Sequence, residues 1–304
     1  MSFKSLIQDL RGVRISSTSN SQSTKALLID QISQPIDGDV KKLLYKYAKE
    51  NDFIQKFKNV VIGEISNFTE KKSVTHFKYK ERIEESFIAD QTEIIALADK
   101  IKKNYKRVFI FSIGGSNLGP ALMNDIFKKD DFNINFITGS DPDEYSNIKI
   151  QDSDALVISS KSFGTLETLS SYKELCGNDF FEQTYAVTAD KIKAQDFGVH
   201  EKNIISFDSS TGGRFSIWSP INLALILLEG DQGYKDFLRG GKDMDAACLN
   251  NPENNPAFQL SAQDIIYNNI LDAETTLVVN YDYKLRNFIS FAQQVEMESN
   301  GKSI

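Results

Sequence analysis

The residues of this chain best suited to do chemistry are a glutamate near its end and an arginine well upstream of it. Glu298 lies in a Glu-Ser-Asn-Gly string, where the glycine indicates a turn that could hold the carboxylate in place. A carboxylate held against a substrate can abstract a carbon-bound proton. Glu296 is a rival for this role. Arg214 follows paired glycines and could place a fixed cation where negative charge develops on a substrate.

Two further segments have the composition of an anion site. In Phe111–Pro120, two glycines let the backbone approach a ligand, and Ser116 offers a hydroxyl near a helix start. In Ser159–Thr168, several hydroxyls surround Lys161 at the start of another expected helix. Amides at a helix start, combined with hydroxyls and a lysine, suit a phosphate dianion. The segments together therefore predict a phosphorylated substrate.

Each segment also has a purely structural interpretation that the residues leave open. Ser116 could merely cap a helix, and Lys161 could be solvated beside a capping cluster. Arg214 could belong to a structural ion pair, whereas Trp218 is expected to fill the core. The glycine turn does not match G-x-G-x-x-G, which disfavours dinucleotide binding.

The elements that must position these residues follow an α/β pattern. From residue 107 onward, short β-branched and aromatic runs alternate with helical segments. Five such runs are Val108–Ile113, Ile134–Thr138, Leu156–Ser159, Thr184–Thr188 and Ile204–Phe207. Runs without clean alternation are typical of a parallel sheet with helices on both faces, and ligands of such sheets lie beyond the carboxyl ends of the strands. The unusual residues cluster at those ends.

Before this pattern, residues 1–100 are predicted to be helical, with amphipathic stretches at Val40–Phe57 and Glu84–Tyr105 and a loop at Ser16–Thr24. After it, a linker rich in asparagine and proline precedes a sixth strand-like run, Thr275–Tyr281, that could open a second sheet. The predicted organisation is a helical region at 1–100, an α/β domain at 101–250, and a linker with the start of a second domain at 251–304.

Composition excludes several classes of protein. With 304 residues, 40% hydrophobic and 25% charged, the chain is neither disordered nor a membrane protein. A net charge of −7 argues against a nucleic-acid scaffold. The N-terminus lacks the continuous apolar core of a secretory signal, so the default expectation is cytoplasmic. Cys176 and Cys248 have no partner motif; we expect reduced structural thiols and predict no zinc site.

Taken in order, the four segments resemble those of the glucose-6-phosphate isomerase (phosphoglucose isomerase) family, whose strings are GIGGS-x-LGP, SKTFTT-x-ET, GGR-x-S-x-W-S and QQ-x-x-MESNGK. The resemblance runs from about residue 107 to the end, includes Gly241–Asp245, and is weak before residue 100. It implies a cytoplasmic enzyme of glycolysis and gluconeogenesis that interconverts glucose 6-phosphate and fructose 6-phosphate through a cis-enediol, without cofactor or metal. It also implies three-layer sugar-isomerase (SIS) domains, each a five-stranded parallel sheet flanked by helices, and a homodimer.

The same resemblance assigns roles to individual positions. Glu298 matches the family's base, and Arg214 matches the residue that stabilises the enediolate. The positions that match the family's substrate or phosphate contacts are Gly115, Ser116, Ser160, Lys161, Ser162 and Thr165. Gln294 lies nearby on the final segment.

The chain departs from the family strings at Ser112, Ser162, Gly164 and Pro220. In the family, a ring-opening histidine, contributed by the neighbouring subunit, and a late lysine lie beyond the matched segments. The chain's two histidines, His76 and His200, match neither position. The expectation is a C-terminally truncated family member with little turnover on its own.

Two other functions remain open. A non-catalytic sugar-phosphate-binding SIS protein would keep the phosphate loop but would not need Glu298 or Arg214. A related isomerase acting on a mannose phosphate or an amino sugar phosphate would share the sheet, but we would not expect it to share the MESNGK string.

Overall fold

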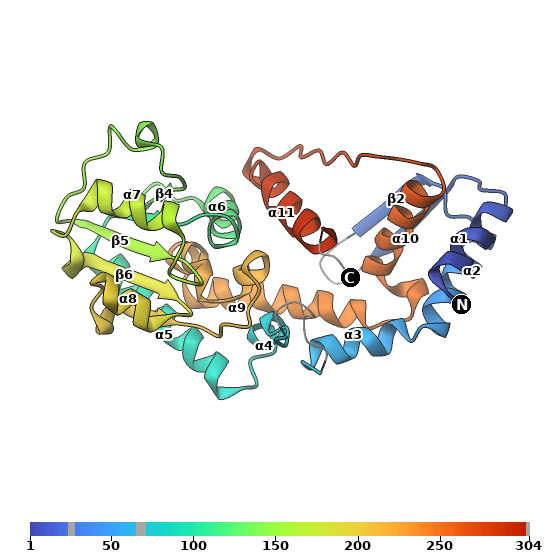
Figure 1. Ribbon diagram of the computed structural model, residues 1–304, viewed down its shortest axis with the longest axis horizontal. Coiled ribbons are helices and arrows are strands. Elements are labelled where there is room, and N and C mark those ends of the chain that lie inside the picture. The colour runs from blue at the N-terminus through green and yellow to red at the C-terminus, as the bar shows by residue number, and fades with distance from the viewer. Residues whose placement is uncertain (24–27, 65–70, 302–304) are drawn as a thin grey trace. The chain divides into compact units, whose positions relative to one another are not determined.

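A computed structural model describes residues 1–23, 28–64 and 71–301 (Figure 1). The chain divides into two compact units. One comprises Met1–Ser73 and Arg239–Val278, and the other Val74–Leu238 and Val279–Ile304. The second unit contains the predicted sheet and every predicted site residue.

The sheet of the second unit has the five predicted strands, all parallel, in the order β4-β3-β5-β6-β7. Their bounds are β3 Arg107–Phe111, β4 Asn133–Ile137, β5 Asp154–Ser159, β6 Thr184–Thr188 and β7 Ile204–Ser206. Every residue of β5 and β6 is buried, which explains why these runs show no alternation in the sequence.

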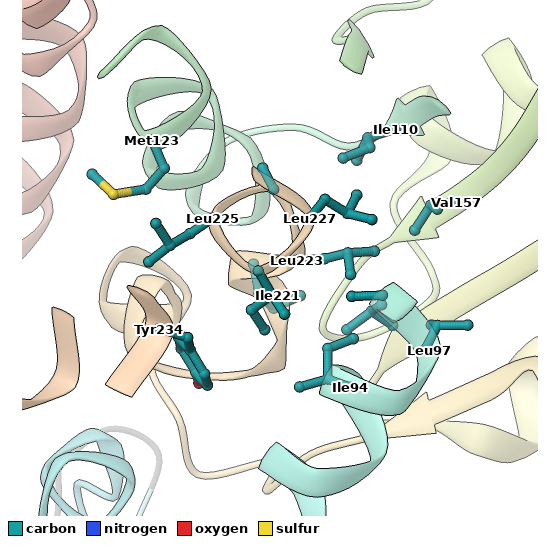
Figure 2. Close-up of a cluster of buried hydrophobic side chains, with 14 of the residues drawn as sticks. Ile94, Leu97, Ile110, Met123, Val157, Ile221, Leu223, Leu225, Leu227 and Tyr234 are labelled. Atoms are coloured by element: carbon teal, nitrogen blue, oxygen red, sulfur yellow. The ribbon is translucent and has the colours of Figure 1, made fainter. Parts of the chain in front are cut away.

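Helices cover both faces of this sheet, as predicted for a three-layer α/β fold (Figure 1). The helices packed on one face are α5 Glu85–Asn104, α6 Gly115–Phe127 and the first part of α9 Leu223–Cys248. The other face packs against α7 Leu166–Cys176 and α8 Lys191–Phe197. Figure 2 shows Ile94 of α5 and Leu227 of α9 in one buried cluster with Val157 of β5. Alternate residues of the central strands therefore serve opposite cores.

Shorter elements complete the second unit. They are α4 His76–Glu81, η1 Pro142–Glu144, η2 Phe181–Gln183, η3 Glu201–Asn203, η4 Gly213–Trp218, η5 Pro220–Asn222, η7 Tyr283–Leu285 and α11 Phe288–Asn300. The buried carboxylate of Asp125 in α6 accepts hydrogen bonds from Arg286 and, at 2.6 Å, from Asn287. Because these two residues immediately precede α11, this ion pair attaches α11 to α6.

The first unit is mainly helical but contains a hairpin that the sequence did not reveal. Its elements are α1 Phe3–Gly12, β1 Thr18–Ser23, β2 Leu28–Gln34, α2 Gly38–Glu50, α3 Phe53–Val61, η6 Pro252–Asn254 and α10 Pro256–Asn269, with the last part of α9. The prediction of a loop at Ser16–Thr24 is wrong where β1 pairs antiparallel with β2, because backbone pairing there outweighs polar composition. The stretch Val40–Phe57 is interrupted at Asp52, which has φ +51°.

The prediction of a sixth strand at Thr275–Tyr281 is also wrong, because these residues form neither helix nor strand. No strand of the described residues pairs with this segment, and Leu277 and Tyr281 are 87% and 97% exposed. Strand propensity without a neighbouring strand leaves the backbone unpaired. Within the described ranges, no helix combines the length and apolar character needed to cross a membrane.

Candidate functional site

The strand order places the candidate segments at one point of the sheet. β3 pairs with β4 on one side and with β5 on the other. All these strands are parallel, but the order in which successive strands are added to the sheet reverses between β3 and β5. Ligands of open parallel sheets bind outside the carboxyl ends of the strands at such a switch point. The glycine turn follows β3, and the segment around Lys161 follows β5.

The glycine turn brings two backbone segments into direct contact. Gly114 has φ +57°, a conformation that favours glycine. A Cβ atom on Gly115 would lie 2.3 Å from the carbonyl carbon and oxygen of Gly213 and 2.8 Å from the nitrogen of Arg214. The Ser216 hydroxyl donates to the Gly115 carbonyl at 3.0 Å. The turn after β3 therefore packs directly against the start of η4, which carries Arg214.

Beside this contact is a hollow of about 100 Å³. Six residues were predicted to contact the substrate or its phosphate from the segments after β3 and β5, and the fold brings all six together in the lining of this hollow. They are Gly115, Ser116, Ser160, Lys161, Ser162 and Thr165. The complete lining is Ile113, Gly115, Ser116, Ser159, Ser160, Lys161, Ser162, Thr165, Thr168 and Gly213.

The segment around Lys161 is fixed in shape by its backbone and by one aromatic side chain. The Ser160 amide donates to Val187 at 3.1 Å, and the Lys161 carbonyl accepts from the Ala189 amide at 3.0 Å. Phe163 has φ +45°, yet its side chain is only 2% exposed and packs edge-on against Phe197. A buried aromatic anchor of this kind holds a strained backbone in place.

The start of α7 has polar groups available to an anion. Thr165 is its N-cap residue, but no side chain caps the helix there, and the Thr165 and Ser160 hydroxyls lie 3.2 Å apart. These two hydroxyls therefore do not cap the helix. Uncapped amides at a helix start attract negative charge. Ser116 likewise does not cap α6, whose N-cap residue is Gly114.

Two hydroxyls of the hollow were missed as site residues. Ser159 and Thr168 are each 3% exposed, and within the described chain neither hydroxyl has a hydrogen-bond partner. Buried polar groups without partners are costly, and a polar ligand in the hollow would relieve that cost. Thr168 follows Thr165 by three residues, so helical periodicity places both on one face of α7 and could have identified Thr168.

The predicted base and the predicted cation are in contact. Nη1 of Arg214 lies 3.1 Å from Oε1 of Glu298, and Nε donates to the Ser299 hydroxyl at 2.8 Å. The Arg214 side chain is 14% exposed and that of Glu298 is 41% exposed. Gln294, one turn earlier in α11, donates to Oε2 of Glu298 at 3.4 Å. The rival carboxylate of Glu296 instead accepts a hydrogen bond from Asn300.

A partly buried polar network supports the loop before Arg214. The Asp208 carboxylate accepts from the Ser210 amide at 2.7 Å and from the Thr75 hydroxyl at 3.3 Å. Tyr79 accepts from the Asp208 amide at 3.3 Å and donates to Asp90 at 2.8 Å. Burial raises the pKa of Asp90 above its usual range. Sequence reasoning missed this network because its members lie far apart in the chain.

Several other side chains singled out in the sequence have structural roles. Trp218 packs against the core and stacks on Phe237 at 4.6 Å. Cys176 and Cys248 are both free of disulfides, and burial raises the pKa of the Cys176 thiol to about 12. His200 lies 3.0 Å from Glu182. No group of three histidine, cysteine or acidic side chains in the described ranges could hold a metal ion. Lys302 of the final motif lies outside the described residues.

Comparison with known proteins gives consistent matches. A family model described as phosphoglucose isomerase matches residues 30–110 and 100–304. The glucose-6-phosphate isomerase of Stutzerimonas stutzeri is 32% identical over 320 residues, which cover 93% of this chain and 58% of the relative. That of Shewanella putrefaciens is 29% identical and covers 93% and 59%. A crystal structure of a glucose-6-phosphate isomerase from Chlamydia trachomatis superposes with a TM-score of 0.80 at 22% identity, covering 99% of this chain and 62% of that one. The chain thus spans about three fifths of the length of these proteins.

Proposed function

This chain belongs to the phosphoglucose isomerase family, and we propose that it carries the active site of an aldose-ketose isomerase. The proposed reaction interconverts glucose 6-phosphate and fructose 6-phosphate through a cis-enediol. The main support is the contact between Gly115 and Gly213, which joins the hollow lined by hydroxyls to the Arg214–Glu298 pair. One substrate could then be held at its phosphate and deprotonated at its other end.

The hollow is proposed to hold the phosphate. At about 100 Å³ it is well below the range of roughly 300 to 1,000 Å³ typical of pockets that enclose a whole small ligand. It suits one compact group, with the sugar outside. Lys161 and the hydroxyls of Ser116, Ser160, Ser162 and Thr165 supply the charge and the hydrogen bonds that a phosphate dianion requires.

Glu298 is proposed to move the proton. In the open-chain aldose, its carboxylate takes the proton from C2, the C–H electron pair forms the C1–C2 double bond, and the C1 carbonyl oxygen becomes anionic. The C1 oxygen then takes up a proton and the C2 hydroxyl loses one, so that O1 becomes a hydroxyl and C2 a carbonyl, and return of the first proton from Glu298 to C1 yields the ketose. Arg214 stabilises the oxyanion, and Gln294 and Ser299 orient the two groups.

The partners and the location are proposed from the family. We propose a homodimer in the cytoplasm that needs no cofactor or metal and binds no nucleic acid; the net charge of −7 is in keeping with the last point. We also propose that residues 101–250 correspond to a first sugar-isomerase domain, preceded by the helical region 1–100, and that residues 251–304 form a linker and the incomplete start of a second.

Neither histidine of the chain is placed to open the sugar ring. His200 pairs with Glu182, and His76 is buried among aromatic rings. We therefore propose that catalysed ring opening is weak in this chain, and that proton exchange on the open-chain sugar is the appropriate activity to measure. The rings of hexose phosphates open slowly in water without a catalyst. Proton exchange therefore needs only the hollow that holds the phosphate, the carboxylate of Glu298 and the guanidinium of Arg214.

A non-catalytic sugar-phosphate-binding protein is the less favoured function. Such a protein would need the hollow but not a carboxylate held by an arginine at its edge. The 3.1 Å contact between Arg214 and Glu298 therefore favours the enzyme.

The test is deuterium incorporation into fructose 6-phosphate in heavy water, followed by NMR. We expect Glu298→Gln to reduce exchange at C1 by about a hundredfold or more while sugar-phosphate affinity stays within about twofold. Glu296→Gln is the matched control, because Glu296 is two residues away and does not contact Arg214, and it should exchange normally. Exchange retained in Glu298→Gln at the rate of the unaltered chain would reject the proposal, and identical purification of all three proteins controls for contaminating host enzyme.

A further inference from the structure

Arg214 lies beside an aromatic stack that the proposed reaction does not use. Its guanidinium carbon is 4.7 Å from the centre of the Phe215 ring. The imidazole of His76 stacks on the same Phe215 ring at 4.5 Å and 18°. His76 also packs on Phe77 at 4.1 Å. Phe215 therefore connects the guanidinium to a histidine more than a hundred residues upstream.

His76 is buried and uncharged. It begins α4 and is 7% exposed. Burial, with smaller contributions from Lys80 and Arg214, lowers its pKa to about 3. Its Nδ1 atom has no hydrogen-bond partner in the described chain. The contacts that His76 makes with Phe77 and Phe215 are therefore through its ring, and its Nδ1 atom takes no part in them.

The backbone around His76 is attached to the loop that carries Arg214. The hydroxyl of Thr75, the preceding residue, lies 3.1 Å from that of Thr211 and 3.3 Å from the Asp208 carboxylate. The histidine ring is thus held in register with the arginine by two independent means, the hydrogen bonds and the stack.

We propose that His76 is a positioning residue for Arg214, acting through the ring of Phe215 to fix the orientation of the guanidinium. The catalytic meaning of this inference rests on the proposed function. Arg214 is also held by the Ser299 hydroxyl and by Glu298, but Glu298 must take up a proton during the reaction, so its ion pair cannot hold the arginine throughout. The stack does not change its charge and holds the guanidinium for the whole cycle.

The test uses the NMR signal of the Arg214 Nε–H group, which donates to Ser299. The chain has seven arginines, and Arg214→Lys identifies the signal by its loss. We expect His76→Ala to shift this signal to the position of an exposed arginine, with rapid exchange with water. We expect His76→Phe to keep it, because a phenyl ring preserves the stack. Phe87→Leu is the matched control: Phe87 lies in α5 and packs on Tyr79, which belongs to α4 as His76 does, so the change should leave the signal unchanged.

A binding measurement adds the functional readout. A phosphorylated aldonate, whose carboxylate imitates the enediolate, should bind His76→Ala about three- to tenfold more weakly than the unaltered chain. Inorganic phosphate should bind both equally, because Arg214 is not among the residues that line the hollow. If His76→Ala does not fold, Phe215→Leu removes the other ring of the stack and should give the same two effects.

An unchanged Arg214 signal and unchanged aldonate affinity in a folded His76→Ala protein would overturn the inference. Failure of the unaltered chain to bind the aldonate would instead count against the isomerase function, and the NMR comparison would still decide the role of His76.

Discussion

The backbone contact at Gly115 can be tested with a single methyl group. In Gly115→Ala, the new Cβ would lie 2.3 Å from the Gly213 carbonyl and 2.8 Å from the Arg214 nitrogen. These neighbours are backbone atoms, so no side chain can rotate away to make room. The loop bearing Arg214 must move, and both the hollow and the Arg214–Glu298 pair should be disturbed.

The expected cost follows from overpacking, which typically destabilises by about 1 to 3 kcal/mol. Each kcal/mol corresponds to roughly 2 to 4 °C in Tm for a folding unit of about 150 to 250 residues. We therefore expect Gly115→Ala to lower the Tm of the second unit by about 2 to 12 °C. Inorganic phosphate should bind at least about tenfold more weakly, because Gly115 lines the hollow.

Gly213→Ala is the matched control on the facing segment. A Cβ there would meet nothing within 4 Å. Its stability should change by less than about 0.5 kcal/mol. Thermal unfolding followed by circular dichroism, and calorimetric titration with phosphate, measure both effects. Our interpretation of the Gly115 contact fails if Gly115→Ala melts and binds like the unaltered chain, or if Gly213→Ala is equally damaging.

Three further predictions concern charge. Lys161→Ala should weaken fructose 6-phosphate binding by about tenfold or more, and Lys202→Ala, which removes a surface charge paired with Glu182, should not; equal affinities by calorimetry would exclude Lys161 from the phosphate site. Asp125→Ala removes the ion-pair partner of Arg286, which precedes α11, and should destabilise the protein by about 1 to 2 kcal/mol. It should also slow deuterium exchange into fructose 6-phosphate, and exchange at the normal rate would refute the role of this ion pair in positioning α11. The pKa of His76 is lowered from 6.5 to about 3, so the unfolded chain takes up this proton first and folding stability should fall by about 2 kcal/mol between pH 7 and pH 5. His76→Phe should reduce that fall, and an identical pH dependence of urea unfolding would contradict the assignment.

The sheet was predictable because its sequence signal is local. Each strand is a short buried run, and residues such as those of β5 carry no alternation because both faces are covered. The hollow was predictable for a related reason. Once the strands are parallel, the segments after β3 and β5 must leave from the same edge of the sheet, so Ser116 and Lys161 come together.

Other features depend on pairings across the chain that the sequence does not record. β1 consists of serine, threonine, asparagine and glutamine, and its backbone pairing with β2 makes it a strand. Thr275–Tyr281 has strand-like residues but no neighbouring strand in the described chain. The stack of His76 on Phe215 and the ion pair between Asp125 and Arg286 likewise join segments that are distant in the sequence. Each partner alone has an ordinary sequence context, so nothing local marks it.

The central claim is that the hollow and the Arg214–Glu298 pair form one site for one sugar phosphate. The most direct measurement is a crystal structure of this chain with a bound phosphorylated aldonate. We predict the phosphate within hydrogen-bond distance of Ser160 and Thr165, and the aldonate carboxylate on the Arg214 guanidinium next to Glu298. A phosphate bound outside the hollow, or a carboxylate remote from Arg214, would contradict the claim.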